Sequence, residues 1–177
     1  NKKINLFGVS AKYIDHLKNE KFNSKHLDLS SIKIITSTGS PLAEESFKYV
    51  YENIKKDVHL SSIAGGTDMV GCLVLGNLYS NVYKGEIQGQ SLGIDVDVFT
   101  DDGRSTKDGE KGELVVKQPF PSMPIKFWGD EGGEKYHKAY FTRFKNTWHH
   151  GDFIERTSNN GFIMRGRSDA TLNPGGV

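Results

Sequence analysis

The sequence predicts an α/β fold followed by a β-rich part, because two kinds of periodicity occupy different regions of the chain. In the first half, apolar residues recur at helical spacing between short apolar runs, which is typical of alternating helices and strands. From Gly85 onward helical periodicity nearly disappears, and alternating runs separated by turn signals replace it. We therefore expect an α/β layer over residues 1–84 and a small antiparallel sheet or distorted barrel over residues 85–168.

Composition and charge are those of an ordinary soluble protein. The 177 residues are 36% hydrophobic and 25% charged, with a net charge of +1, which gives no reason to expect nucleic acid or an anionic membrane as partner. No apolar stretch reaches transmembrane length or resembles a signal peptide. The single cysteine, Cys72, excludes an internal disulfide and fits a reducing compartment such as the cytoplasm. Because Cys72 lies within an apolar run, we expect its thiol to be buried and inert.

Two helices and two strands are predicted in the first half. Ser10 can cap a helix that runs to about Lys18 with one apolar face. A short buried strand over residues 32–36 precedes a second helix, in which Pro41 suits the first helical position. A strand over residues 58–63 completes a strand–helix–strand unit. Such a unit places the loops after both strands at one edge of a parallel sheet.

The segment Ser61–Asp68, after the second of these strands, contains candidate ligand-binding residues. Gly65 and Gly66 allow backbone amides to approach a ligand and to form a concave anion site. Thr67 and Asp68 then offer a hydroxyl and a carboxylate, a pair suited to a phosphate oxygen and its Mg²⁺. For this octapeptide alone, the alternative is a plain turn that needs two residues of positive φ.

The second half is predicted to consist mainly of strands. Alternation over residues 93–99 predicts a half-buried strand, and residues 112–116 predict another. An aromatic-rich stretch follows, with one or two helical turns expected at residues 138–144. Residues 148–155 and 161–165 are predicted as the arms of a hairpin, because an Asn-Gly pair lies between them.

Two late motifs offer further candidate residues. Asp152, at a turn beside a glycine, could accept hydrogen bonds from a cis-diol such as ribose, or could be a solvated turn aspartate. Neighbouring residues of a strand point to opposite faces, so His149 and His150 are not expected to share a metal ion. Arg167 could reach ribose or phosphate oxygens, or could belong to a surface charge cluster.

In their order and spacing, these segments resemble those of the adenylate-forming superfamily of acyl-CoA synthetases, luciferases and peptide-synthetase adenylation domains. Within it, the chain is most similar to the acetoacetyl-CoA synthetase family, over essentially all 177 residues. The similarity rests on the ordered occurrence of Gly39-Ser40-Pro41, Gly65-Gly66-Thr67-Asp68, Trp148-His149-His150-Gly151-Asp152 and Gly166-Arg167-Ser168-Asp169. It implies part of a large N-terminal domain, followed at residues 169–177 by a hinge and the start of a C-terminal domain.

The resemblance also implies roles for individual residues. Positions that match the nucleotide site are Gly39, Ser40, Pro41, Ser62, Gly65, Gly66, Thr67, Asp152 and Arg167. Asp152 matches the residue that grips the ribose hydroxyls, and Thr67 matches the catalytic threonine that contacts the phosphates. Asp68 stands where most members have a glutamate that helps hold Mg²⁺, and its shorter side chain favours a water-bridged contact. Asp169 matches the hinge, and Gly175 and Gly176 match, more weakly, a turn along the CoA route.

The substrate implied is acetoacetate. At residues 62–65 acetate-activating members carry bulky aromatic residues, whereas Ile63, Gly65 and Gly66 here are expected to line a roomier acyl pocket. The implied reaction joins acetoacetate to CoA through an acyl-adenylate, with ATP converted to AMP and pyrophosphate. Two alternatives stay open: a ligase for another short acid such as acetate or propionate, and a non-catalytic binding module whose glycines serve only as turns.

Two elements of the family are not found in this sequence: the glycine- and serine-rich phosphate loop that ends in lysine, and the catalytic lysine of the C-terminal domain. The chain also begins without methionine and ends at Gly175-Gly176-Val177. We therefore expect a fragment of a longer ligase, which should be inactive alone.

Overall fold

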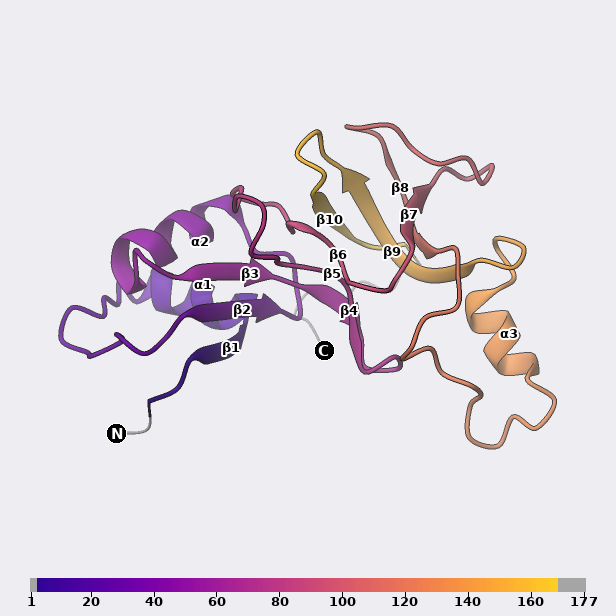
Figure 1. Cartoon of the computed structure of the whole chain (residues 1–177), viewed down its shortest axis with the longest axis horizontal. Coiled ribbons are helices and arrows are strands. Elements are labelled where there is room, and N and C mark those ends of the chain that lie inside the picture. The colour runs from indigo at the N-terminus through magenta and orange to yellow at the C-terminus, as the bar shows by residue number, and fades with distance from the viewer. Residues whose placement is uncertain (1–2, 169–177) are drawn as a thin grey trace. The chain divides into compact units, whose positions relative to one another are not determined.

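The computed structural model describes residues 3–168, whose contacts divide into two units (Figure 1). Within the described part, the first unit comprises residues 3–64 and 75–89, and the second comprises residues 65–74 and 90–168. The domain assignment made from the sequence, with boundaries after residues 84 and 168, stays a prediction. None of the helices in this described range has the length and apolar character that crossing a membrane requires.

The first unit is built on a parallel sheet of three strands in the order β1-β2-β3. Its strands are β1 (Leu6–Ser10), β2 (Ile34–Thr38) and β3 (His59–Ser62). The predicted strand–helix–strand unit is confirmed, although β2 begins two residues later than expected. β1 was not predicted, because Gly8 interrupts its short apolar run.

Helix α1 (Ala11–Asn19) begins where the sequence predicts, because the Ser10 hydroxyl accepts a hydrogen bond from the backbone N–H of Tyr13 at 3.1 Å. The second helix begins later than predicted. Pro41 precedes it by three residues, since α2 (Glu44–Tyr49) starts after the extended Ala43 and continues as a π-helical turn, η1 (Val50–Ile54). Pro41 is therefore not the first helical residue.

Apolar side chains from the helices and the parallel sheet form the core of the first unit. The buried members are Ala11, Ile14, Ile32, Ile35, Leu42, Phe47, Tyr49, Val50, Val58 and Leu60. Burial of Leu42, which is 4% exposed, draws the segment after Pro41 against this core in extended form instead of a helical turn. This explains the late start of α2.

Short strands connect the two units in sequence. They are β4 (Ala64–Gly66), β5 (Gly71–Leu75) and β6 (Gly89–Gln90), in a sheet of order β4-β5-β6. Cys72 lies in β5, half-buried, and burial raises the pKa of its thiol. A thiol with a raised pKa is a poorer nucleophile at neutral pH, which agrees with the expected inert role.

The second unit contains an antiparallel sheet of order β10-β9-β8-β7. Its strands are β7 (Val96–Phe99), β8 (Lys111–Val116), β9 (Trp148–Arg156) and β10 (Phe162–Arg167). The predicted hairpin is confirmed as β9–β10. A closed barrel is not confirmed, because the described strands β7 to β10 form an open sheet of four strands.

The strand predicted as half-buried over residues 93–99 starts at Val96 and is buried more completely than expected. Asp97, a charged residue in this strand, is only 6% exposed. Its carboxylate accepts hydrogen bonds from the Ser105 hydroxyl at 2.8 Å and from the Arg156 guanidinium at 2.5 Å, and Lys117 lies 3.3 Å away. These partners offset the cost of burying the charge.

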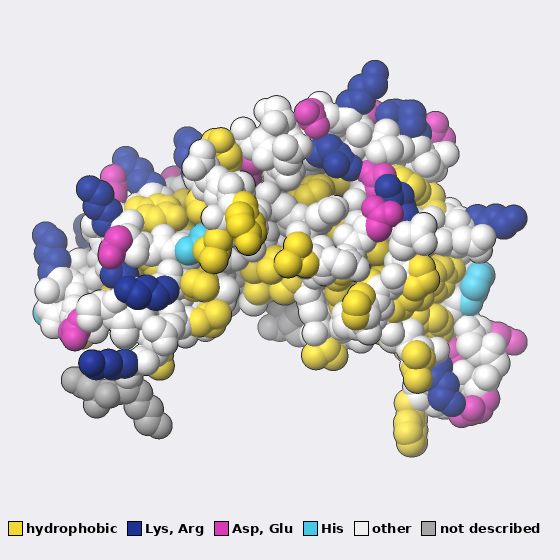
Figure 2. All heavy atoms as spheres, in the orientation of Figure 1, with side chains coloured by type: hydrophobic (Ala, Val, Ile, Leu, Met, Phe, Trp, Pro, Cys, Tyr) yellow, Lys and Arg dark blue, Asp and Glu magenta, His cyan; other side chains and the backbone are white. Residues whose placement is uncertain are grey.

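Helix α3 (Glu134–Tyr140) lies four residues before the predicted position at 138–144. The Asp130 carboxylate explains the shift, because it accepts hydrogen bonds from the first-turn N–H groups of Lys135 at 3.2 Å and Tyr136 at 2.9 Å. Figure 2 shows that side chains of both charge signs are interspersed over the visible face, in keeping with the small net charge.

Candidate functional site

Gly65 and Gly66 lie in strand β4, and not in the loop that the sequence predicts. Neither is among the described residues with positive φ, so space and not backbone conformation is what a side chain would test at these positions. A Cβ atom on Gly65 would lie 2.1 Å from the carbonyl oxygen of Gly71, in the neighbouring strand β5. A Cβ atom on Gly66 would lie 2.0 Å from Asp68 Oδ1 and 3.0 Å from His150 Cε1. The glycine pair thus allows close approach of β5, Asp68 and His150.

Thr67 and Asp68 occupy the turn between β4 and β5, which the backbone N–H of Val70 closes by donating to the Thr67 carbonyl at 3.3 Å. Both side chains are exposed. The Asp68 carboxylate is nevertheless held, because the Tyr140 hydroxyl at the end of α3 donates a hydrogen bond to its Oδ2 atom. The turn therefore presents a hydroxyl beside an oriented carboxylate.

The Tyr140 ring stacks on the indole of Trp148, with 3.6 Å between ring centroids and an interplanar angle of 13°. Trp148 is 2% exposed, and its Nε1–H donates to His150 Nδ1 at 3.3 Å. Since that nitrogen accepts, the neutral imidazole carries its proton on Nε2, which lies 3.6 Å from Asp152 Oδ2. A continuous set of contacts therefore runs from Asp68 to Asp152.

Asp152 lies at a bulge in strand β9, which gives this part of the strand its shape. Glu113 of β8 pairs with Phe153 while Val115 pairs with His149, so β9 contains two extra residues between these pairs. Gly151, at the centre of this segment, has φ of 83°. Bulges of this kind redirect side chains and often occur beside active sites.

Arg167 meets Asp152 across the hairpin. The two residues are register partners of β10 and β9, and Arg167 Nη1 lies 3.6 Å from Asp152 Oδ1. The same guanidinium donates to the His150 carbonyl at 3.3 Å. Asp152 is 7% exposed, so its carboxylate lies between a guanidinium and an imidazole with little access for solvent. Such a carboxylate is a rigid acceptor for a ligand hydroxyl.

The neighbouring histidine faces another carboxylate. His149 Nε2 lies 2.8 Å from Glu113 Oε2, on the side of the strand away from the His150–Asp152 pair. The two imidazoles therefore contact different acids, as the alternation of a strand predicts.

The predicted nucleotide-site residues of the first unit lie at the carboxyl edge of its parallel sheet. Gly39 follows β2 with φ of 83°, and Ser62 ends β3 beside its register partner Ser37. The Ile63 backbone N–H donates to the Ser37 carbonyl at 2.9 Å, which extends this pairing by one residue. This edge also contains Ser40 and Pro41, which follow β2 directly, and open α/β sheets bind ligands at such an edge.

Three predicted positions, Asp169, Gly175 and Gly176, lie outside the described residues. Conversely, the sequence did not identify Tyr140 or the connecting role of Trp148 and His150. A weak signal for them exists in the aromatic-rich stretch before Asp152, but its spacing follows no single period.

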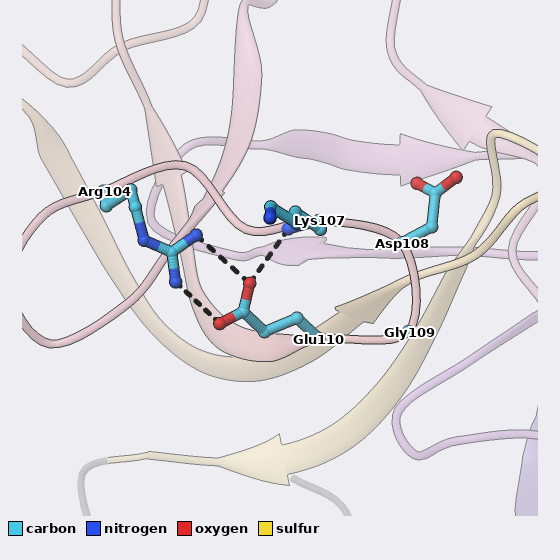
Figure 3. Close-up of a pocket in the computed structure, with 5 residues that line it drawn as sticks. All are labelled: Arg104, Lys107, Asp108, Gly109 and Glu110. Atoms are coloured by element: carbon cyan, nitrogen blue, oxygen red, sulfur yellow. Dashed lines mark hydrogen bonds and ion pairs between the residues drawn. The ribbon is translucent and has the colours of Figure 1, made fainter.

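A surface depression lies elsewhere in the second unit. It has a volume of about 530 Å³ and is lined by Arg104, Lys107, Asp108, Gly109 and Glu110 (Figure 3). Its charges are largely paired, because the Arg104 guanidinium donates to both oxygens of Glu110, at 2.7 and 3.2 Å. Hydrogen bonds from Arg104 and from the Lys107 backbone lower the pKa of Glu110 to about 2. None of the predicted site residues lines this depression, so the Asp68–Asp152 cluster is the candidate site.

Comparison with known proteins identifies relatives of the whole chain. No protein-family model matches it. Acetoacetyl-coenzyme A synthetase of Rhizobium meliloti (strain 1021) is 57% identical over 173 residues, and acetoacetyl-CoA synthetase of Gallus gallus is 46% identical over 177 residues. These matches cover 97% and 98% of this chain and 26% of each relative. The chain thus spans about a quarter of the length of the curated relatives it matches.

A solved structure is similar over the same extent. Acetoacetyl-CoA synthetase from Streptomyces lividans has a TM-score of 0.85 and 37% sequence identity with this chain, covering 97% of it and 27% of the solved chain. Sequence and fold thus agree over nearly all residues. The chain is therefore a homologue of the acetoacetyl-CoA synthetases that corresponds to about a quarter of their length.

Proposed function

We propose that this chain is part of an ATP-dependent acid–thiol ligase that converts acetoacetate, ATP and CoA into acetoacetyl-CoA, AMP and pyrophosphate. The observation that carries the proposal is the similarity of 97% of the chain to a protein named acetoacetyl-coenzyme A synthetase, at 57% identity. The proposed course has two steps: the acid attacks the α-phosphate of ATP, and the CoA thiol then attacks the acyl-adenylate. We place this ligase in the cytoplasm, which a single cysteine supports.

In this proposal, Asp152 binds the ribose hydroxyls of ATP and AMP. Its carboxylate is buried between His150 and Arg167, so it cannot turn away without losing both partners. Arg167 supplies a positive charge beside the same ligand, for ribose or phosphate oxygens. Gly39, Ser40, Pro41 and Ser62 contribute the nucleotide-binding surface of the first unit, at the carboxyl edge of its sheet.

Thr67 and Asp68 are proposed to bind the phosphates and Mg²⁺. Their adjacent exposed hydroxyl and carboxylate are the oxygen donors that Mg²⁺ prefers when it also binds substrate phosphates. Mg²⁺, when bound, supplies charge neutralisation for the triphosphate. The protein's own contribution is to orient the Asp68 carboxylate through Tyr140 and to keep space above Gly66, where Asp68 Oδ1 lies.

The acyl pocket is proposed to include Ile63, Gly65 and Gly66. Here the structure adds a physical condition, because a side chain at Gly65 would be directed against the main chain of β5. Any effect of its bulk on acid choice would therefore be accompanied by strain. The hinge at Asp169 and the CoA contact at Gly175 and Gly176 also stay proposals.

The test is acid-dependent exchange between ATP and labelled pyrophosphate in the full-length ligase that carries this chain, with acetoacetate, acetate and propionate compared. Acetoacetate should give the highest kcat/KM. A higher value with acetate or propionate would assign the enzyme to another short acid. Absence of exchange with every acid, combined with a rise in Tm on adding ATP, would instead identify a non-catalytic nucleotide-binding module.

A further inference from the structure

Tyr140 reaches Asp68 across 72 positions of sequence, and this is the only described hydrogen bond that ties the exposed Asp68 side chain to α3. The Tyr140 hydroxyl donates to Oδ2, whereas Oδ1 lies over Gly66, 2.0 Å from where a Cβ would be. The contact therefore occupies one oxygen of the carboxylate and sets the direction of the other.

The donor itself is held firmly. The Tyr140 ring stacks on Trp148, which is 2% exposed, and has edge contacts to Phe127 and Tyr136, with centroid distances of 5.8 and 5.4 Å. A phenol is protonated near neutral pH, so its hydroxyl donates to the carboxylate, which can only accept.

We propose that Tyr140 is a positioning residue for Asp68: its hydroxyl fixes the carboxylate so that Oδ1 is presented toward Mg²⁺, or toward a water bound to Mg²⁺. This inference rests on the proposed function of Asp68. A ligand-orienting hydrogen bond of this kind raises metal affinity, because the carboxylate does not lose rotational freedom when the metal binds.

Tyr136 provides a matched control on the same helix. It lies one helical turn before Tyr140 and also contacts the Trp148 ring, at a centroid distance of 6.2 Å. Its hydroxyl, however, donates to the Pro124 carbonyl at 2.5 Å. Tyr136→Phe and Tyr140→Phe therefore remove the same group from the same aromatic cluster, and only the second removes a contact with Asp68.

The experiment compares these two variants with the wild type in the full-length ligase. One arm measures the Mg²⁺ dependence of acetoacetate-dependent pyrophosphate exchange. A second arm measures the Kd of Mn²⁺ in the presence of ATP by electron paramagnetic resonance, which requires no turnover. Tyr140→Phe should raise both the half-saturating Mg²⁺ concentration and the Kd for Mn²⁺ by about tenfold, as loss of a ligand-orienting hydrogen bond does in other metal sites. At saturating Mg²⁺ its kcat should change little.

Tyr136→Phe should leave both metal constants unchanged. Metal constants that stay at the wild-type value in Tyr140→Phe would overturn the inference, as would tighter metal binding, which would show that Tyr140 competes with the ion. An equal effect of both variants, with an equal fall in Tm, would reduce Tyr140 to a packing role. Failure of the proposed function is distinguishable, because the wild type itself would then lack exchange with acetoacetate.

Discussion

Asp152 is constrained from three directions. The bulge of β9 sets its backbone, with Gly151 at φ of 83°. His150 Nε2 and Arg167 Nη1 each lie 3.6 Å from one of its carboxylate oxygens. Since the side chain is already oriented, the ribose contact proposed for Asp152 would require little reorganisation of the protein.

Removing this carboxylate should weaken nucleotide binding. In the full-length ligase, Asp152→Ala is expected to cost roughly 2–4 kcal/mol of AMP binding, because charge-assisted hydrogen bonds are lost. Asp152→Asn keeps the shape and one acceptor oxygen, so its loss should be smaller. Calorimetry gives the Kd for AMP, and Asp108→Ala, which changes an exposed turn aspartate, is the control. Unaltered AMP binding in both Asp152 variants would exclude a ribose contact.

Any side chain at position 65 should destabilise the protein through overpacking. A Cβ atom there would be 2.1 Å from the Gly71 carbonyl oxygen and 2.5 Å from Cys72 Cα, both main-chain atoms that cannot rotate away. We expect Gly65→Ala to destabilise the protein by about 1–3 kcal/mol, the usual cost of overpacking.

Chemical denaturation measures this cost, and Gly132→Ala is the matched control. Gly132 has ordinary φ, and a Cβ atom would be 3.8 Å from Glu134 Cγ, a normal contact. If both alanine variants unfold at the same denaturant concentration, the close approach of β5 is not the reason that position 65 requires a glycine. In that case a separate role of Gly65 in the acyl pocket gains weight.

Helix α1 shows how much a single cap contributes to an element. It has nine residues and no acidic side chain in its first turn, so the Ser10 hydroxyl is its main N-terminal interaction. His16 and Lys18 lie in its last turn, where positive charge suits the helix dipole. An isolated helix of this length is marginal in water, and its stability comes from the packing of Ala11 and Ile14.

Ser10→Ala should therefore destabilise the protein by about 1 kcal/mol, the typical value for loss of an N-cap. Ser10 is exposed, so the substitution leaves no cavity in the core. Ser10→Asn retains a capping oxygen and should restore most of the loss. Thermal unfolding of both variants checks this. An asparagine variant as unstable as the alanine variant would mean that the pairing of Ser10 in β1, and not the cap, sets the cost.

Buried charge networks connect distant parts of the second unit. Glu113, 2% exposed, contacts the His149 imidazole at 2.8 Å, the Arg143 guanidinium at 2.8 Å and the Ser168 hydroxyl at 2.5 Å. Burial alone would raise the pKa of Glu113, but the hydrogen bonds from His149 and Ser168 and the charge of Arg143 outweigh it and lower the pKa. One carboxylate thus joins β8, β9 and the residues that flank the hairpin.

This network should make stability depend on acid pH. Because the pKa of Glu113 is lower in the folded protein than its ordinary value of 4.5, its stabilisation is complete above that value. It is lost as pH falls through the folded pKa. Glu113→Gln should lower Tm at neutral pH and flatten the fall in Tm below about pH 4.5. Glu110→Gln, in an exposed pair with Arg104, should change neutral-pH stability little. The same acid dependence in Glu113→Gln as in the wild type would contradict this.

The sequence by itself determined the class of fold and most elements, and it predicted the candidate ligand-binding residues, because all of these can be inferred from local patterns. Helical spacing after Ser10, alternation in the β-rich half and an Asn-Gly turn are readable from neighbouring residues. The same locality explains the errors. The start of α2 depends on burial of Leu42, and the start of α3 depends on a carboxylate several residues earlier, Asp130.

The tertiary structure alone decided which residues meet. The sequence predicted Asp68 and Asp152, but the Tyr140 and Trp148 contacts that connect them join segments far apart in the chain. The tertiary structure also showed that Gly65 is required by a neighbouring strand and not by its own φ. Close packing is a property of pairs of segments after folding, so no periodicity within either segment encodes it.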